Sequence, residues 1–175
     1  MLHTPNQNSG SSRFCGPTAV MSVTGVVGSD VRDAVRQARG DIRDANGAHM
    51  PVMGVSNADL VATMILLGWE VAEEWTSPSG KLEIDRSTYD DETGSYRKAK
   101  RPDGFKPHLF SDFLRERGNG GPYIVNVTGH YMAVGGGEVC DSYDRFLPTE
   151  IDRYLARGRA KYRNAWVWKW WRFEQ

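Results

Sequence analysis

The sequence has few cysteines, no excess of charge of either sign and no long apolar run. Its 175 residues include only Cys15 and Cys140, so a disulfide-rich scaffold is not expected and a reducing cytoplasmic compartment is the default. Lys plus Arg and Asp plus Glu each number 22, which argues against a nucleic-acid-binding protein. No stretch approaches the ~20 apolar residues that cross a bilayer, and the polar start lacks the apolar core of a signal peptide. We therefore expect neither a nucleic-acid nor a membrane partner.

Metal-binding patterns are also missing. The four histidines are His3, His49, His108 and His130. None of them lies in a C-x-x-C or H-E-x-x-H pattern, the spacings typical of zinc sites. We therefore expect no metal and no other cofactor.

Helical patterns come first in the chain and strand patterns come later. A helix that begins near Ser56 opens with a capping box in which Asp59 takes the place of the usual Glu. The other predicted helices span about 16–24, 31–39, 109–117 and 149–157, and the predicted strands span about 69–75, 122–127, 130–134, 138–142 and 165–173. This order predicts a single domain over residues 1–175 with an α+β fold, in which an N-terminal helical layer packs on a C-terminal antiparallel sheet.

A polar segment interrupts this pattern from about residue 77 to residue 107. It is rich in charged residues, Ser, Gly and Tyr and poor in aliphatic residues. We interpret it as a solvated insertion, with a short hairpin within 81–97, rather than as a lid over a substrate.

The last predicted strand carries four tryptophans. They are Trp166, Trp168, Trp170 and Trp171. Such a density favours packing in a core and against a sheet, and an exposed aromatic binding platform is the alternative.

A cysteine stands where the polar start of the chain meets the first predicted helix. Cys15 precedes Gly16 and Pro17, and Pro is tolerated in the first turn of a helix because the N–H there has no partner. A thiol at this place lies near the positive end of the helix dipole and near free N–H groups, which favour the nucleophilic thiolate. The segment indicates covalent catalysis by cysteine, and a small buried core residue is the alternative.

A nucleophilic cysteine needs a base, and the base needs an orienting group. His130 begins one predicted strand and Asp141 lies in the next, with three glycines between the strands. A turn at 135–136 places the two residues directly opposite each other, whereas a turn at 136–137 makes them diagonal neighbours on one face. In both registers Cys140 points to the other face as a packed thiol. A three-residue turn without a bulge puts Asp141 on the opposite face. The alternative to a catalytic pair is a His and an Asp at strand ends that meet only solvent.

The motifs around these residues resemble the papain-like cysteine peptidase superfamily, and within it most closely the C39-like branch. They read Cys-Gly-Pro-Thr-Ala from residue 15, Gly-His-Tyr-Met-Ala-Val from residue 129 and Val-Cys-Asp-Ser from residue 139. The resemblance covers these three short segments and their order. It implies a papain-like fold in which Cys15 is the nucleophile, His130 the general base and acid, and Asp141 the orienting residue.

The same resemblance implies an oxyanion-hole donor ahead of the cysteine. The superfamily usually supplies a Gln or Asn several residues before the nucleophile, and at that spacing this chain has Ser9. Gln7 and Asn8 stand close by, and Asn6 is a further possibility. The resemblance therefore points to Gln7 or Asn8 as the side-chain donor, with the Cys15 backbone N–H as the second donor.

The expected function is that of a thiol hydrolase that cleaves a peptide or isopeptide bond in a protein or peptide substrate through an acyl-enzyme. A transglutaminase-like acyltransferase would use the same three residues with an amine in place of water. A catalytically silent papain-like module that acts in binding or assembly is a third interpretation, and a peptidoglycan amidase of related fold is a fourth.

Overall fold

The protein is described from a computed structural model that covers residues 1–5, 14–49, 52, 54–77, 89–90, 95–96, 108–142, 147–157, 162 and 164–175. In chain order the elements are α1 (Cys15–Thr24), α2 (Gly28–Ala38), α3 (Asn57–Leu66), β1 (Glu70–Thr76), β2 (Tyr89–Asp90), β3 (Ser95–Tyr96), α4 (Phe110–Arg117), β4 (Tyr123–Val127), β5 (His130–Gly135), β6 (Glu138–Cys140), β7 (Thr149–Glu150), α5 (Ile151–Ala156) and β8 (Val167–Glu174). They form an α+β fold around a six-stranded antiparallel sheet with strand order β1-β8-β4-β5-β6-β7. None of the helices in these ranges is long and apolar enough to cross a membrane.

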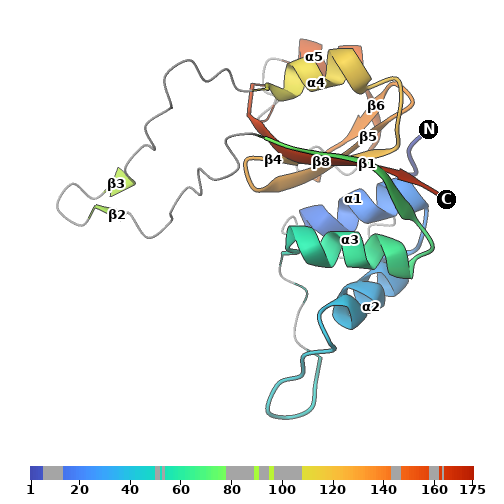
Figure 1. Ribbon diagram of the computed structural model, residues 1–175, viewed down its shortest axis with the longest axis vertical. Helices are drawn as coiled ribbons and strands as arrows, with labels where there is room; N and C mark the ends of the chain where they lie inside the picture. The colour runs from blue at the N-terminus through green and yellow to red at the C-terminus, as the bar shows by residue number, and fades with distance from the viewer. Residues whose placement is uncertain are drawn as a thin grey trace.

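Helices cover both faces of the sheet (Figure 1). The N-terminal helices lie on one face, where α1 and α3 contact the sheet, α2 packs against α1 and α3, and a core forms around Met21, Leu60 and Trp171. The later helices α4 and α5 pack on the other face, where a second core contains Phe113 and Trp170. The expected N-terminal helical layer is therefore present. The sequence pattern predicted α4 and α5 but not that they form a second layer on the opposite face.

Local signals explain where α3 begins but not where α2 begins. The Ser56 hydroxyl accepts the Asp59 N–H at 3.1 Å, and the Asp59 carboxylate accepts the Ser56 N–H, so the expected capping box is confirmed. For α2 the expected start near residue 31 is wrong. The helix begins at Gly28, and the Ser29 hydroxyl donates to the Asp30 carboxylate instead of capping the backbone. Asp30 then lies in the first turn, where its charge is favourable to the helix dipole.

The turn between β5 and β6 decides between the two registers that keep His130 and Asp141 on one face. Ala133 pairs with Cys140 and Gly135 with Glu138, so the turn consists of Gly136 and Gly137, both with positive φ. The turn at 135–136 is therefore wrong, and the second register applies. Gly135 is not a turn residue, and glycine fits there because a Cβ would lie 3.2 Å from the Pro122 Cα.

The tryptophans of the last strand divide into two groups. Trp170 and Trp171 are buried on opposite faces of the sheet, so the expected core role is correct for these two. Trp166 and Trp168 are half-buried, and their ring centroids lie 6.1 Å apart. Between β4 and β8 the pairing passes from Lys169 to Val167 in one step, so Trp168 is the extra residue of a β-bulge.

Little of the expected polar insertion belongs to the described residues. Within it, β2 pairs antiparallel with β3 through Tyr89 and Tyr96, which agrees with the short hairpin expected in this part of the chain. Residues 78–88, 91–94 and 97–107 lie outside the described residues.

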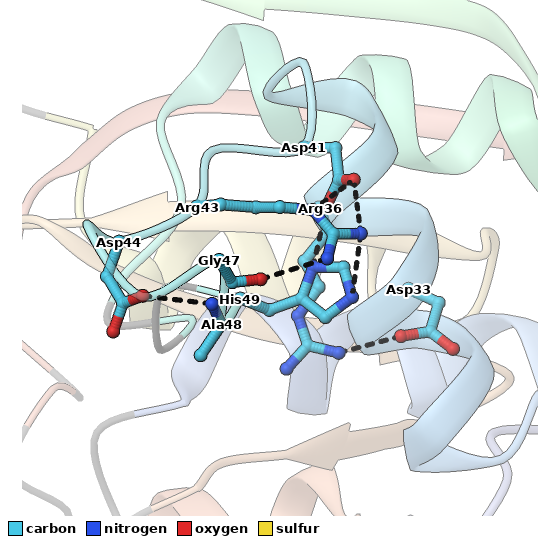
Figure 2. A network of polar contacts seen from close by, with 8 residues as sticks. All are labelled: Asp33, Arg36, Asp41, Arg43, Asp44, Gly47, Ala48 and His49. Atoms are coloured by element: carbon cyan, nitrogen blue, oxygen red, sulfur yellow. Dashed lines mark hydrogen bonds and ion pairs between the residues drawn. The ribbon is translucent and has the colours of Figure 1, made fainter.

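A polar loop follows α2 and is held by its own side chains (Figure 2). The Asp41 carboxylate lies 3.0 Å from the Arg43 guanidinium and 2.7 Å from Nδ1 of His49. Arg43 also donates a hydrogen bond to the Gly47 carbonyl. The Asp44 carboxylate accepts the backbone N–H of Ala48 at 2.9 Å. The Arg43 guanidinium lowers the pKa of Asp41, so these contacts keep the carboxylate charged to lower pH than usual.

Candidate active site

The cysteine at the start of α1 is partly exposed and lies at a helix end that no described side chain caps. Phe14 is the N-cap residue, and the first turn carries no acidic residue. The backbone N–H groups of Tyr131 and Gly16 donate to the Cys15 sulfur. Gly16 is needed as glycine because a Cβ there would lie 2.9 Å from a Val55 methyl group. The thiol is thus held at the positive end of a helix beside polar backbone hydrogens.

A tight turn delivers the histidine to the same place. His130 is the first residue of β5 and pairs with Val127 across the turn Thr128–Gly129. Both turn residues have positive φ, and the Gly129 N–H donates to the Asn126 side-chain oxygen at 3.1 Å, which fixes the turn. His130 is buried, so its ring position is determined by packing on all sides.

The aspartate meets the histidine diagonally across the hairpin. Because Ala133 pairs with Cys140, Asp141 lies opposite Met132. His130 is two residues before Met132 and therefore points to the same face of the sheet as Asp141. The Asp141 Oδ1 lies 2.8 Å from His130 Nε2, and both side chains are 5% exposed. The hydroxyl of Tyr154, on α5, donates to Met132 Sδ at 3.9 Å, and burial together with the nearby Asp141 charge raises the pKa of this phenol. The carboxylate is therefore buried directly against the imidazole ring.

Electrostatics couple the three residues. Burial alone would raise the pKa of Cys15, but the hydrogen bond with His130, backbone N–H groups and the His130 charge together lower it below its usual value. Burial likewise opposes the charged form of His130, but the hydrogen bonds with Asp141 and Cys15 prevail and raise its pKa to about 9. Both shifts favour a thiolate–imidazolium pair. With Nε2 directed at Asp141, the other ring nitrogen of His130 is the one left for the sulfur.

An aromatic ring that the sequence did not single out covers the imidazole. Tyr162 stacks on His130 with 4.5 Å between ring centroids and 14° between the planes. The stretch around Tyr162 has no helical or strand periodicity, so no signal in the sequence could assign the contact. Tyr154 was detectable only as the inward face of a short amphipathic helix with Ile151.

The second cysteine belongs to the core. Cys140 is 1% exposed and lies in the core on the α1 side of the sheet, as its expected packing role requires. Burial raises the pKa of its thiol to about 11. A thiol in this environment is a poor nucleophile at neutral pH, which leaves Cys15 as the candidate for a reactive thiol.

The expected oxyanion-hole side chains cannot be placed in this arrangement. Gln7 and Asn8, like Asn6 and Ser9, lie outside the described residues. The backbone N–H of Cys15 remains as a donor at the helix start. Across the described ranges, no group of three or more His, Cys, Asp and Glu side chains is arranged to hold a metal ion.

The geometry joins a thiol, an imidazole and a carboxylate in the order required for nucleophilic catalysis: nucleophile, base and orienting group. Comparison with protein-family models, with curated protein sequences and with solved structures finds no significant match to this chain. The assignment of a function therefore depends on the chemistry of Cys15, His130 and Asp141.

Proposed function

We propose that this protein is a papain-like cysteine hydrolase that cleaves peptide or isopeptide bonds. The observation that carries the proposal is the buried imidazole of His130, hydrogen-bonded on one side to Asp141 and on the other to a thiol at a helix N-terminus. A histidine with a purely structural role in a core needs only one hydrogen-bond partner, either a carboxylate or a thiol, and not both. The combination of a thiol with a lowered pKa and an imidazole with a raised pKa is the one that chemistry at a carbonyl requires.

In the first half of the reaction the Cys15 thiolate attacks the carbonyl carbon of the scissile bond. The backbone N–H groups at the start of α1 stabilise the negative charge that develops on the carbonyl oxygen. The imidazolium of His130 then donates its proton to the leaving nitrogen, the C–N bond breaks, and a thioester to Cys15 remains with neutral His130.

In the second half water releases the acyl group. Neutral His130 accepts a proton from a water molecule while the oxygen of that water attacks the thioester carbon. The C–S bond breaks, a carboxylic acid leaves, and the thiolate–imidazolium pair is restored. Asp141 stays ionised and keeps the Nε2–H of His130 directed away from the sulfur, so that the other nitrogen handles the proton.

The test is cleavage of a mixture of synthetic peptides of random sequence, analysed by mass spectrometry. We expect new amino termini with the wild-type chain and none with Cys15→Ala or His130→Ala, while Cys140→Ser retains activity. Cleavage that persists in Cys15→Ala, or its absence from the wild type together with an unreactive Cys15, would contradict the proposal.

The same experiment with an added primary amine separates hydrolysis from acyl transfer. A hydrolase releases free carboxylic acids even when the amine is present. Products in which the amine has replaced water throughout would instead assign the site to acyl transfer, since the acyl-enzyme is common to both reactions.

A further inference from the structure

A polar side chain at the start of α3 shares the end of the molecule that carries Cys15. Helices α1 and α3 lie side by side under the sheet (Figure 1). Val55, two residues before α3, packs against Gly16 in the first turn of α1. The first residue of α3 is Asn57, and its side chain is exposed.

A chain of hydrogen bonds fixes the orientation of the Asn57 amide. The Gly129 N–H donates to the oxygen of Asn126, so the Asn126 Nδ2 group is free to donate to the Asn57 oxygen at 3.0 Å. The Tyr131 hydroxyl donates to the same Asn57 oxygen at 2.6 Å. The amide oxygen of Asn57 is thereby occupied twice. Its Nδ2 group takes no part in this network and remains an oriented pair of N–H donors.

Tyr131 connects this network to the nucleophile. Its backbone N–H donates to the Cys15 sulfur while its phenol reaches Asn57. Burial and the neighbouring charge of Cys15 both raise the pKa of the Tyr131 phenol, so the hydroxyl keeps its proton and remains a donor. The Asn57 donors therefore lie one tyrosine side chain away from the reactive sulfur.

The chemistry of these donors selects the kind of group they can bind. Neutral N–H donors bind an oxygen acceptor, and the thiolate nearby disfavours an anionic one. A main-chain carbonyl of a peptide is neutral and occurs at every residue of an extended substrate. A residue beside the nucleophile can hold the substrate in place by a hydrogen bond to such a carbonyl. This contact does not depend on the side chains of the substrate.

We propose that the side-chain Nδ2 group of Asn57 donates a hydrogen bond to a main-chain carbonyl oxygen of the peptide whose acyl group is transferred to Cys15. This inference rests on the proposed hydrolase function. It makes Asn57 a substrate-binding residue, and it makes Asn126 and Tyr131 positioning residues that orient its amide.

The test compares two electrophiles with the same reactive group. Acetyl-Ala-Ala chloromethyl ketone carries main-chain carbonyls, whereas chloroacetone carries none. The ratio of their alkylation rates at Cys15 measures what the peptide main chain contributes. The variant is Asn57→Asp, whose carboxylate still accepts from Asn126 and Tyr131 and suits the first turn of a helix, but which has no N–H donors.

A matched variant controls for the added charge. Ala58→Asp introduces the same charge at the next, exposed position of α3, outside the hydrogen-bond network. We expect the rate ratio to fall roughly 3- to 10-fold in Asn57→Asp, the loss of one hydrogen bond, and to stay at the wild-type value in Ala58→Asp. Chloroacetone should react equally with both variants.

Two failures are distinguishable. A rate ratio that is the same in the wild type, Asn57→Asp and Ala58→Asp overturns the role of Asn57 and leaves the proposed hydrolase intact. A Cys15 that reacts with chloroacetone no faster than free cysteine does at neutral pH overturns the proposed function and the inference together.

Discussion

Removal of the Asp141 charge tests the electrostatic coupling at the site most sharply. The carboxylate lies 2.8 Å from the buried His130 ring, and the pKa of that ring rises from 6.5 to about 9. A shift of this size corresponds to about 3 kcal/mol in favour of the imidazolium. Asp141→Asn keeps an oxygen that accepts from Nε2–H and removes the charge, whereas Asp141→Ala removes both.

The readout is the pH dependence of Cys15 alkylation by iodoacetamide in a Cys140→Ser background. The thiol and the imidazole titrate as a pair, so a change that makes the charged form of His130 less stable raises the pKa of Cys15. We expect the midpoint of reactivity to move up by about one pH unit in Asp141→Asn, since a charge-assisted hydrogen bond is roughly twice as strong as a neutral one. In Asp141→Ala the midpoint should move further.

Tyr154→Phe is the control for an indirect effect on packing. It removes a buried hydroxyl near Asp141 but leaves the carboxylate charge in place, so its midpoint should move less than that of Asp141→Asn. Identical midpoints in the wild type, Asp141→Asn and Asp141→Ala would refute the argument that Asp141 raises the pKa of His130 and so stabilises the thiolate.

Three further predictions concern other parts of the account. Peptide cleavage should decline as pH rises through about 9, because His130 then loses the proton that the leaving amine requires, and a pH–rate profile measures this limb. Tyr162→Ala should lower kcat and shift the pH at which cleavage declines. Tyr162→Phe keeps the stacked ring and should leave kcat and that pH unchanged. Ser56→Ala should lower the free energy of unfolding in urea by about 1 kcal/mol, while Ser29→Ala, whose hydroxyl caps no helix, should change it by less than about 0.5 kcal/mol.

Features that depend on neighbouring residues in the chain were predictable. The capping box of α3 needs only Ser56 and Asp59, and the structure has it. The proximity of His130 and Asp141 follows from strand alternation, because either two-residue turn places them on one face and only a three-residue turn separates them.

Features that depend on distant segments were not predictable. Three consecutive glycines are equally suited to a turn, and the pairing with Glu138 puts Gly135 in the strand, where the Pro122 backbone leaves little room for a Cβ. The stacking of Tyr162 on His130 joins an irregular stretch to a buried ring. The placement of α4 and α5 on the face opposite α1 depends on chain direction across the sheet, which hydrophobic periodicity does not encode.

The candidate site shows the same division. Cys15 at a helix start is a local feature, and its partner His130 is remote in sequence but signalled by its motif. The orientation of the Asn57 amide depends on contacts with Asn126 and Tyr131, which lie on strands far along the chain. The motifs therefore pointed to the three residues of the candidate site but not to the groups around them.

The central claim is that Cys15 forms an acyl-enzyme that His130 then hydrolyses, and the mass of the intact protein after brief exposure to p-nitrophenyl acetate measures this directly. We expect one added acetyl group on Cys15, which disappears with time in the wild type, persists longer in His130→Ala and is absent from Cys15→Ala. Acetyl groups found only on other residues, or an acetyl on Cys15 that the wild type never releases, would contradict it.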